Sequence, residues 1–441
     1  MLSSKAKIGI WGFGVVGQSI ARYLAKSGYA DLMVHDVKDV GAHPLLRECR
    51  AVFVAELADL LEGCDFVFPG PGIDLELYQA YSAKFISELD LFYQQWQKPI
   101  IAITGTLGKT TLTTLLANIL NQCGIRAIAA GNVGLAMCDI LDSDYELVVL
   151  ELSSFQLESC RFFAPDIAIW TNLYPNHLDR HKTMHNYFAA KAKVFLHQHA
   201  NQIALLPTSL MSDLKNLQIP GQCYFFGEMP LDIGVPNYVK GVFTRCGADI
   251  ILQAGAKQIK IANIAALKKI DTYEINLVAL AAVFYLQQII LPPDLQFRAI
   301  AHRVEKFYTN RGIDFYNDSK STVAQATLAA VQKLTGRPII LFLGGLSKGV
   351  DRASLVQNLK GSVQLIICFG GEAEALHAMC AAQQITSAKF VNLESAFDYC
   401  LEVAKTGDQV LFSPAGSSFD LFANYVERGE VFKRLVLAKY I

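Results

Sequence analysis

Residues 100–111, IIAITGTLGKTT, decide the fold of the chain. The first five residues are apolar or β-branched and predict a buried strand. The next residues form a loop of the spacing GxxGK, shorter than the common GxxxxGK form, and a helix-like run follows Lys109. A glycine loop between a strand and a helix N-terminus cradles phosphates with its backbone N–H groups. The segment therefore predicts a parallel α/β sheet that binds a nucleotide; a helix that merely begins with a lysine is the alternative.

Two side chains of this loop carry the expected chemistry. Lys109 would neutralise the β- and γ-phosphates of ATP, and the Thr110 hydroxyl would reach Mg²⁺. Glu151 ends a later strand-like run, where a carboxylate can meet a metal held at the loop. His177 follows the next such run, and the histidines around it show neither an HExxH pattern nor a companion cysteine. We therefore expect no zinc site.

A second glycine motif lies near the start of the chain. Gly12, Gly14 and Gly17 form GxGxxG between a strand-like and a helix-like run, and Asp36 ends the next strand-like run. This is the dinucleotide-binding fingerprint in its usual context. The helix N-terminus attracts a pyrophosphate whichever nucleotide carries it, and Asp36 would hold a ribose hydroxyl or the imide edge of a uracil. Taken alone, the motif favours an NAD-dependent enzyme.

Three α/β patterns follow one another along the chain. Residues 1–97 predict a Rossmann-like domain, residues 98–299 a central P-loop ATPase-type parallel sheet with antiparallel additions, and residues 300–441 a doubly wound α/β domain. The additions are expected as an antiparallel meander between residues 220 and 265, where short alternating runs are separated by glycines. The length of 441 residues agrees with a prior of about three domains.

The composition excludes several classes of protein. With 39 basic and 40 acidic residues the net charge is −1, and no Lys/Arg-rich run marks a nucleic-acid partner. The ten cysteines are widely spaced without a CxxC, as expected of reduced thiols. The longest apolar run, residues 277–286, is too short for a membrane span and predicts a buried helix. We expect a cytoplasmic protein with no membrane partner and no signal peptide.

Nine motifs together resemble one family, the ATP-dependent Mur ligases of peptidoglycan synthesis, over nearly the whole chain. They stand in the family's order and at close to its spacing. They are GTLGKTT at 105–111, GNVG at 131–134, ELSSFQLE at 151–158, NHLDRH at 176–181, YFAAK at 187–191, HRVE at 302–305, NDSKST at 317–322, LGGLSKG at 343–349 and SPAGSSFDLF at 413–422. The third and ninth motifs look most like the member that adds D-glutamate to UDP-N-acetylmuramoyl-L-alanine.

The resemblance implies an ATP-dependent acid–amino-acid ligase with two Mg²⁺ ions. The residues that it places at ATP are Gly105, Thr106, Gly108, Lys109, Thr110, Thr111, Asn276, Arg303 and Asp318. Around the metals it places Thr110, Glu151, His177 and Lys191, with Asn132 beside the first ion. Lys191 matches the lysine that the family carbamylates, and Lys320 joins Lys109, His177 and Lys191 as a catalytic residue. The third domain would close onto ATP.

The same resemblance places the other two substrates. The UDP-sugar would lie against Gly12, Gly14, Val15, Gly17, Asp36, Pro71, Gly72 and Asn132. D-Glutamate would be held by Thr322, Lys348, Ser418 and Tyr425. The implied reaction activates the alanyl carboxylate as an acyl phosphate, which the amine of D-glutamate then attacks. The partners expected are these three substrates only, bound by a monomer.

The chain departs from the family pattern in its ATP-binding half. Leu107 stands where the loop usually has asparagine, Asn176 where an aspartate usually precedes the histidine, and Thr272 and Tyr273 where a His-Asn pair usually precedes Asn276. We expect an active enzyme, because the residues at the phosphates and metals are kept. The alternatives are a related Mur or folylpolyglutamate-type ligase for another amino acid, an NAD-dependent oxidoreductase, and a non-catalytic nucleotide-binding relative.

Overall fold

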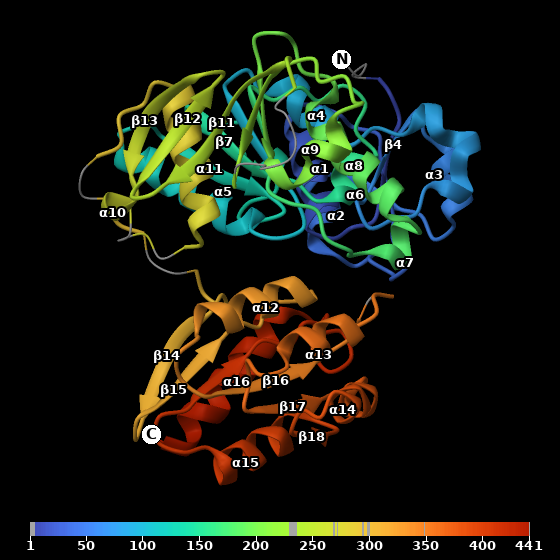
Figure 1. Ribbon diagram of the computed structural model, residues 1–441. Coiled ribbons are helices and arrows are strands. Elements are labelled where there is room, and N and C mark those ends of the chain that lie inside the picture. The colour runs from blue at the N-terminus through green and yellow to red at the C-terminus, as the bar shows by residue number, and fades with distance from the viewer. Residues whose placement is uncertain are drawn as a thin grey trace. The chain divides into compact units, whose positions relative to one another are not determined.

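The computed structural model describes residues 5–228, 236–267, 270, 272–292, 295–297, 300–347 and 349–440. Within these residues, the strands form three sheets of four, nine and six strands, each packed against helices (Figure 1). This confirms the predicted fold class. The chain divides into two compact units, Met1–Leu173 with His185–Phe297, and Tyr174–Met184 with Arg298–Ile441. The first unit holds the first two sheets, and the second unit holds the third.

The first sheet is parallel throughout, with the order β3-β2-β1-β4. Its core places α1 and α2 on one face and α3 on the other. Gly17 of α1 is required by packing, since a Cβ there would overlap the Gly12 carbonyl oxygen. The bounds are β1 Ile8–Trp11, α1 Val15–Lys26, β2 Leu32–His35, α2 Pro44–Glu48, β3 Ala51–Phe53, α3 Leu57–Gly63, β4 Phe66–Pro69, η1 Glu76–Lys84 and α4 Glu88–Gln95.

The central sheet has the order β13-β12-β11-β10-β9-β8-β5-β7-β6. Its strands are β5 Ile100–Thr104, β6 Ala127–Gly131, β7 Leu147–Glu151, β8 Ile167–Trp170, β9 Ile203–Pro207, β10 Gln222–Phe226, β11 Val239–Cys246, β12 Asp249–Ala254 and β13 Lys257–Asn263. The helices of this part are α5 Lys109–Gln122, η2 Met137–Ile140, α6 Ser154–Glu158, α8 Met184–Leu196, η3 Thr208–Leu210, α9 Met211–Leu214, α10 Ile264–Leu267 and α11 Glu274–Leu286.

The expected antiparallel meander is wrong for its first strand. β10 pairs in parallel with β9 and with β11, and only the pairs β11–β12 and β12–β13 are antiparallel. Residues 227–238 separate β10 from β11, and a connection of that length permits the crossover that a parallel pair needs. The tight glycine turns between β11, β12 and β13 allow antiparallel pairing only.

The apolar run at 277–286 lies within α11, and its residues up to Phe284 are buried, as predicted. The helix packs against α5 and against β10, β11 and β13. Within the described residues, no helix combines the length and apolar character that crossing a membrane requires. All ten cysteines are free, and eight of them are buried.

The third sheet has the order β14-β15-β19-β16-β17-β18, with β14 antiparallel to β15 and the other pairs parallel. The helices α12 to α14 pack on one face, and α15 and α16 on the other (Figure 1). The bounds are α7 Leu178–His181, β14 Glu305–Asn310, β15 Ile313–Asn317, α12 Ala324–Lys333, β16 Ile339–Gly344, α13 Ala353–Leu359, β17 Leu365–Phe369, α14 Ala373–Ala382, β18 Ser387–Phe390, α15 Leu393–Val403, β19 Gln409–Phe412 and α16 Tyr425–Tyr440.

Candidate functional site

The phosphate loop between β5 and α5 is hydrogen-bonded to the two residues that follow β8, Thr171 and Asn172. The Leu107 N–H donates to Asn172 Oδ1 over 2.8 Å, and the Thr171 hydroxyl donates to the Leu107 carbonyl oxygen over 2.6 Å. Gly108 has φ +81° and precedes α5, a backbone conformation that suits glycine. Lys109 Nζ donates to the Thr106 carbonyl oxygen over 3.1 Å, which folds the ammonium back over the loop. Thr171 and Asn172 thus hold the loop through the backbone groups of Leu107, and these contacts do not depend on the Leu107 side chain.

A second lysine lies beneath this loop. Lys191 of α8 is 1% exposed, and its Nζ lies 2.9 Å from the Gly105 carbonyl oxygen. Nζ also lies 4.6 Å from the ring centre of Tyr187, one helical turn earlier, whose hydroxyl contacts Thr106 Oγ1 at 3.2 Å. Burial lowers the pKa of Lys191 well below its ordinary value, the charge of Lys109 lowers it further, and Glu151 acts in the opposite direction. These surroundings make the ammonium form of Lys191 less favourable than it is for a lysine in water.

Glu151 ends β7, and Asn132 directly follows the neighbouring strand β6. Asn132 Nδ2 donates to Glu151 Oε1 over 2.9 Å, and the Asn132 N–H donates to the Glu151 carbonyl oxygen over 2.9 Å. Glu151 is 2% exposed and stands opposite Ile103 of β5 in the parallel register. The carboxylate therefore lies at the same sheet edge as the phosphate loop, Thr110 and Lys191. The structure brings together these three residues predicted for the metals.

Asn276 lies beside the phosphate loop at the start of α11. Its Nδ2 donates to Thr272 Oγ1 over 2.9 Å, and a Cβ added to Gly108 would lie 3.5 Å from its Oδ1. The side chain is 4% exposed, so the Thr272 hydroxyl sets which way the amide faces. A cavity of about 740 Å³ adjoins this turn of α11, lined by Gly227, Glu228, Thr244, Arg245, Gly247, Glu274, Ile275 and Val278.

In the first sheet, Asp36 holds the glycine turn. Its Oδ2 accepts the Phe13 N–H over 2.7 Å and its Oδ1 accepts the Lys38 N–H over 3.0 Å. Burial raises the pKa of Asp36, but these backbone hydrogen bonds outweigh it and the pKa falls below its usual range. A Cβ on Gly12 would lie 3.5 Å from Ile73 Cδ1, so the turn adjoins the segment that contains Pro71 and Gly72.

Two of the residues beside that turn face open space. Val15 is 72% exposed, and a Cβ added to Gly14 would meet nothing within 4 Å. The residues predicted for the UDP-sugar thus lie at the carboxyl ends of the neighbouring strands β1, β2 and β4, except Asn132, which follows β6 in the central sheet.

His177 belongs to the second unit, in the segment Tyr174–Met184. It has a left-handed backbone, φ +56°, and precedes α7. Its N–H donates to Asn176 Oδ1 over 3.1 Å, so the asparagine caps the turn that carries the histidine. A Cβ on Gly349 would lie 3.7 Å from the Asp179 nitrogen, which places this segment beside the loop after β16.

In the second unit, Asp318 closes the loop after β15. Its carboxylate accepts hydrogen bonds from the Val304 N–H over 3.1 Å and from the hydroxyls of Ser321 and Ser413. Burial raises the pKa of Asp318 to about 6, although these hydroxyls and the charge of Arg303 act in the opposite direction. Asp318 therefore shapes the loop from within the protein.

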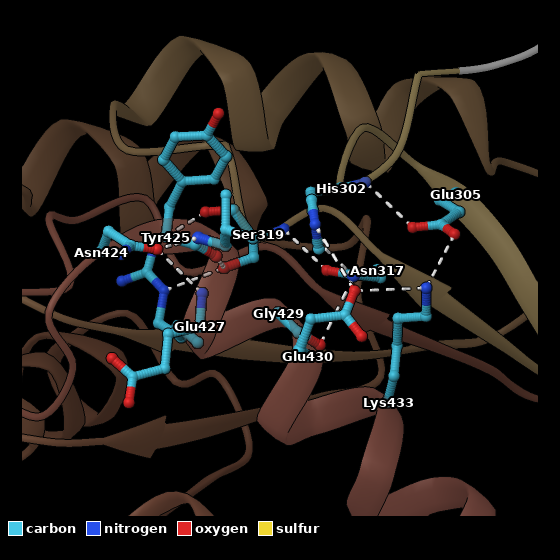
Figure 2. Close-up of polar contacts among 12 residues, drawn as sticks. His302, Glu305, Asn317, Ser319, Asn424, Tyr425, Glu427, Gly429, Glu430 and Lys433 are labelled. Carbon is cyan, nitrogen blue, oxygen red and sulfur yellow. Dashed lines mark hydrogen bonds and ion pairs between the residues drawn. The ribbon is translucent and has the colours of Figure 1, made fainter. Parts of the chain in front are cut away.

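Figure 2 shows how the next residues of that loop are held. His302 Nδ1 accepts a hydrogen bond from Asn317 Nδ2 over 2.8 Å, and the His302 carbonyl oxygen accepts the Lys320 N–H over 3.2 Å. The Ser319 hydroxyl donates to the Tyr425 carbonyl oxygen over 2.8 Å. Lys320 Nζ lies 5.0 Å from the ring centre of Tyr425. Lys320 and Tyr425, both predicted site residues, are neighbours.

Three loops meet at the carboxyl ends of β15, β16 and β19. Leu346 and Ser417 exchange backbone hydrogen bonds of 3.0 and 2.9 Å, and the Ala415 N–H donates to the Ser321 carbonyl oxygen over 3.0 Å. Ser418 is buried beside this junction and Thr322 follows Ser321 in it. The prediction for Lys348 lies outside the described residues. Sequence reasoning missed two buried arginines, Arg352 and Arg428, which donate to carbonyl oxygens of these loops.

Comparisons with known proteins show what the chain is similar to. Two family models match, the Mur ligase middle domain over residues 103–220 and the Mur ligase, glutamate ligase domain over residues 302–416. The UDP-N-acetylmuramoylalanine–D-glutamate ligase of Desulfotalea psychrophila is 34% identical over 97% of this chain and 95% of its own. That of Caldanaerobacter subterraneus is 32% identical over 98% of both chains.

Solved structures share the fold at low identity. A pseudomurein peptide ligase type C from Methanothermus fervidus matches with a TM-score of 0.59 and 16% identity, over 98% of this chain and 100% of that one. The MurF ligase of Thermotoga maritima in complex with ADP matches with a TM-score of 0.59 and 16% identity, over 99% and 96%. At this identity the likeness shows the fold.

Proposed function

Because this chain belongs to the Mur ligase family of ATP-dependent amino-acid ligases, we propose that it joins D-glutamate to UDP-N-acetylmuramoyl-L-alanine. The observation that carries the proposal is the grouping of Lys109, Glu151 and Lys191 at one sheet edge, around a phosphate loop. The two substrates proposed are those after which the full-length relatives are named. The product would be a precursor of peptidoglycan, made by a cytoplasmic, monomeric enzyme.

The reaction has two steps. An oxygen of the alanyl carboxylate attacks the γ-phosphorus of ATP, the bond to ADP breaks, and an acyl phosphate forms. The amine of D-glutamate then attacks the acyl carbon, phosphate leaves, and the amine loses its proton. Lys109 stabilises the charge that accumulates on the phosphates in the first step. Lys320, held by the backbone of His302, supplies positive charge to the tetrahedral intermediate of the second.

The residues at the loop fit Mg²⁺, which takes oxygen ligands. Thr110 offers a hydroxyl, and Glu151 a carboxylate that is 2% exposed and oriented by Asn132. When bound, Mg²⁺ supplies charge neutralisation between the two reacting anions. His177 is proposed as a ligand of a second ion, and Arg303 as a contact to ATP.

Lys191 is suited to carbamylation. Burial and the nearby charge of Lys109 lower the pKa of its amine, which makes the neutral form more accessible than it is for a lysine in water. A neutral amine attacks the carbon of CO₂, a new N–C bond forms, and the nitrogen loses a proton. The product is an anion close to Lys109, where it would offer oxygen ligands in place of an amine. We propose this modification as part of the active enzyme.

The departures from the family pattern are compatible with activity. Leu107 contributes its backbone groups to the loop, and Thr272 orients Asn276 through its hydroxyl. Asn176 still accepts the N–H of His177. We therefore keep Asn276 as the proposed adenine contact. The three domains, with boundaries after residues 97 and 299, are proposed to bind the UDP-sugar, ATP and the amino acid in that order along the chain.

Phosphate release tests the proposal. The purified protein is given ATP, Mg²⁺ and UDP-N-acetylmuramoyl-L-alanine, and D-glutamate, L-glutamate, L-alanine and a diamino acid are offered in turn. We expect release that depends on D-glutamate. Release with a different amino acid would keep the ligase chemistry and overturn the substrate, and no release with any of them would favour a non-catalytic relative.

A further inference from the structure

Arg352 is a charged side chain buried beneath two of the three loops that meet in the second unit. It immediately precedes α13 and is 4% exposed. Its Nη2 donates to the Gly344 carbonyl oxygen over 3.0 Å and to the Ala415 carbonyl oxygen over 2.8 Å. Gly344 ends β16, and Ala415 lies in the loop after β19. One guanidinium therefore ties the ends of two neighbouring strands, and burying it is costly unless its charge is used.

The link continues through Glu372 to Ser347 in the loop after β16. Arg352 Nη1 lies 3.6 Å from Glu372 Oε2, and Glu372 Oε1 accepts the Ser347 N–H over 2.8 Å. Ser347 directly precedes Lys348 in the sequence. Arg352 and Glu372 thus connect the loop after β16 with the loop that carries Ser418. Both loops contain residues proposed to hold the amino acid.

The turn that Arg352 holds has an unusual backbone. Ala415 has φ +57°, a left-handed conformation that a non-glycine residue rarely adopts. At Gly416 a Cβ would overlap Arg352 Nη2. Arg428 Nη1 donates to the Gly416 carbonyl oxygen over 2.9 Å, so two consecutive carbonyl oxygens each accept from a buried cation. Arg352 and Arg428 thus hold this strained turn through its two carbonyl oxygens.

The direction of these carbonyl groups matters for an anionic ligand. A carbonyl oxygen repels a carboxylate, whereas an N–H group attracts it. In a trans peptide the N–H of the next residue points opposite to the carbonyl. With the Ala415 oxygen on Arg352, the Gly416 N–H leaves the turn on the other side, and no described residue accepts it. The arginines thereby occupy the acceptors of the turn. Of its donors, the N–H groups of Ala415 and Ser417 donate to the carbonyl oxygens of Ser321 and Leu346, which leaves the Gly416 N–H for a ligand.

We propose that Arg352 is a positioning residue for the amino-acid substrate. Arg352 holds the turn at 415–416 so that the Ala415 carbonyl oxygen points toward the guanidinium. The Gly416 N–H and Ser418 are then free to donate hydrogen bonds to a carboxylate of the amino acid. The inference rests on the proposed function, because it takes the amino acid to bind at these loops. Arg352 acts through the turn and does not contact the reacting atoms.

The test compares Arg352→Met and Arg352→Lys with a matched control, Arg337→Met. Arg337 also donates to loop carbonyl oxygens, those of Gly312 and Gly407, but at the amino ends of the strands of the same sheet. For each protein, KM is measured for D-glutamate, ATP and the UDP-sugar, together with kcat and the thermal unfolding midpoint. A structural role alone would change stability and would not single out one KM.

We expect Arg352→Met to raise the KM for D-glutamate by about tenfold, because the substrate carboxylate would lose one charge-assisted hydrogen bond to the displaced turn. The KM for ATP should change by less than about twofold. Arg352→Lys should recover part of the loss, and Arg337→Met should lower the unfolding midpoint alone. An unchanged KM for D-glutamate in Arg352→Met, or equal effects of Arg352→Met and Arg337→Met on that KM, would overturn the inference.

If Arg352→Met does not fold, Glu372→Ala takes its place. It removes the link to Ser347 and should raise the KM for D-glutamate while leaving that for ATP; an unchanged KM for D-glutamate would contradict the inference equally. The failure of the proposed function would be seen first and separately, as a wild-type protein that releases no phosphate with D-glutamate.

Discussion

The Nζ atom of Lys191 lies 2.9 Å from the carbonyl oxygen of Gly105, inside the phosphate loop and away from solvent. The two residues are 86 positions apart in sequence. This contact joins the helix α8 to the loop that precedes α5, and it places an amine of lowered pKa beside Lys109. The chemistry proposed for the protein depends on the carbamylation of this amine.

Activity should depend on CO₂ if Lys191 is carbamylated. Enzyme equilibrated in CO₂-free buffer should lose activity, and bicarbonate should restore it, because the carbamate forms and decays reversibly. Lys191→Ala should lower kcat by more than about a hundredfold, as expected for a residue that organises a metal, and bicarbonate should not restore it. Phosphate release with and without bicarbonate checks both. Wild-type activity that is indifferent to CO₂ removal would argue against the carbamate.

Lys109→Met should lower kcat on the order of a thousandfold, because the ammonium that offsets phosphate charge is lost. The matched control is Lys98→Met, whose Nζ likewise donates to carbonyl oxygens, those of Ser143 and Tyr145, on an exposed surface. The control should retain the kcat of the wild type. Steady-state phosphate release gives both values, and a Lys109→Met protein that keeps a tenth of the wild-type kcat would contradict the role given to Lys109.

Thr272→Val should raise the KM for ATP about fivefold, the effect of one neutral hydrogen bond, because the amide of Asn276 loses the hydroxyl that orients it. Thr272→Ser keeps the hydroxyl and should behave like the wild type. The KM for D-glutamate should be the same in all three proteins. If Thr272→Val binds ATP as the wild type does, Asn276 is not oriented by Thr272 in any way that matters for the nucleotide.

Asp318 should make stability depend on pH. Its pKa is raised to about 6 in the folded protein, from 3.8. The folded state therefore binds the proton of Asp318 more tightly than the unfolded state does. The stabilisation that results from this difference is fully present below about pH 4 and is lost as the pH rises through 6. The shift corresponds to about 3 kcal/mol.

Asp318→Asn has no such proton. Its stability relative to the wild type should therefore increase between pH 4 and pH 7, by up to the same amount, on top of any constant change from altered hydrogen bonds. Thermal unfolding midpoints of the two proteins across this range provide the check. Midpoints that stay a fixed distance apart would mean that the pKa of Asp318 is not raised.

Much of the fold follows from local patterns. The strand, glycine loop and helix at 100–111 have their period and turn chemistry in the sequence itself, and so do the parallel strands at 339–344 and 409–412. The hairpin of β14 and β15 was not predicted individually, although the Arg311-Gly312 turn between two alternating runs signals it. The direction of β10 depends on its neighbours β9 and β11, and no local pattern encodes that.

The site shows the same limit. Motifs named Lys109, Glu151 and Lys191, but only the pairing of β5 with β7 and the packing of α8 bring them together. Arg352 and Arg428 resemble surface arginines in the sequence, since nothing near them marks burial. Part of their role arises from contacts that are distant in sequence: Arg352 contacts Ala415, 63 residues away, and Arg428 contacts Ser319, 109 residues away. The role of a side chain that acts through distant backbone groups can be identified only from the structure.

Oxygen-18 in the alanyl carboxylate of UDP-N-acetylmuramoyl-L-alanine tests the central claim most directly. With ATP, Mg²⁺ and D-glutamate, one labelled oxygen should appear in the released phosphate, because the carboxylate oxygen that attacks ATP leaves with the phosphorus. The labelled product should contain D-glutamate in amide linkage. Phosphate without label, or labelled phosphate that forms only with another amino acid, would contradict the assignment of this protein as a D-glutamate ligase that works through an acyl phosphate.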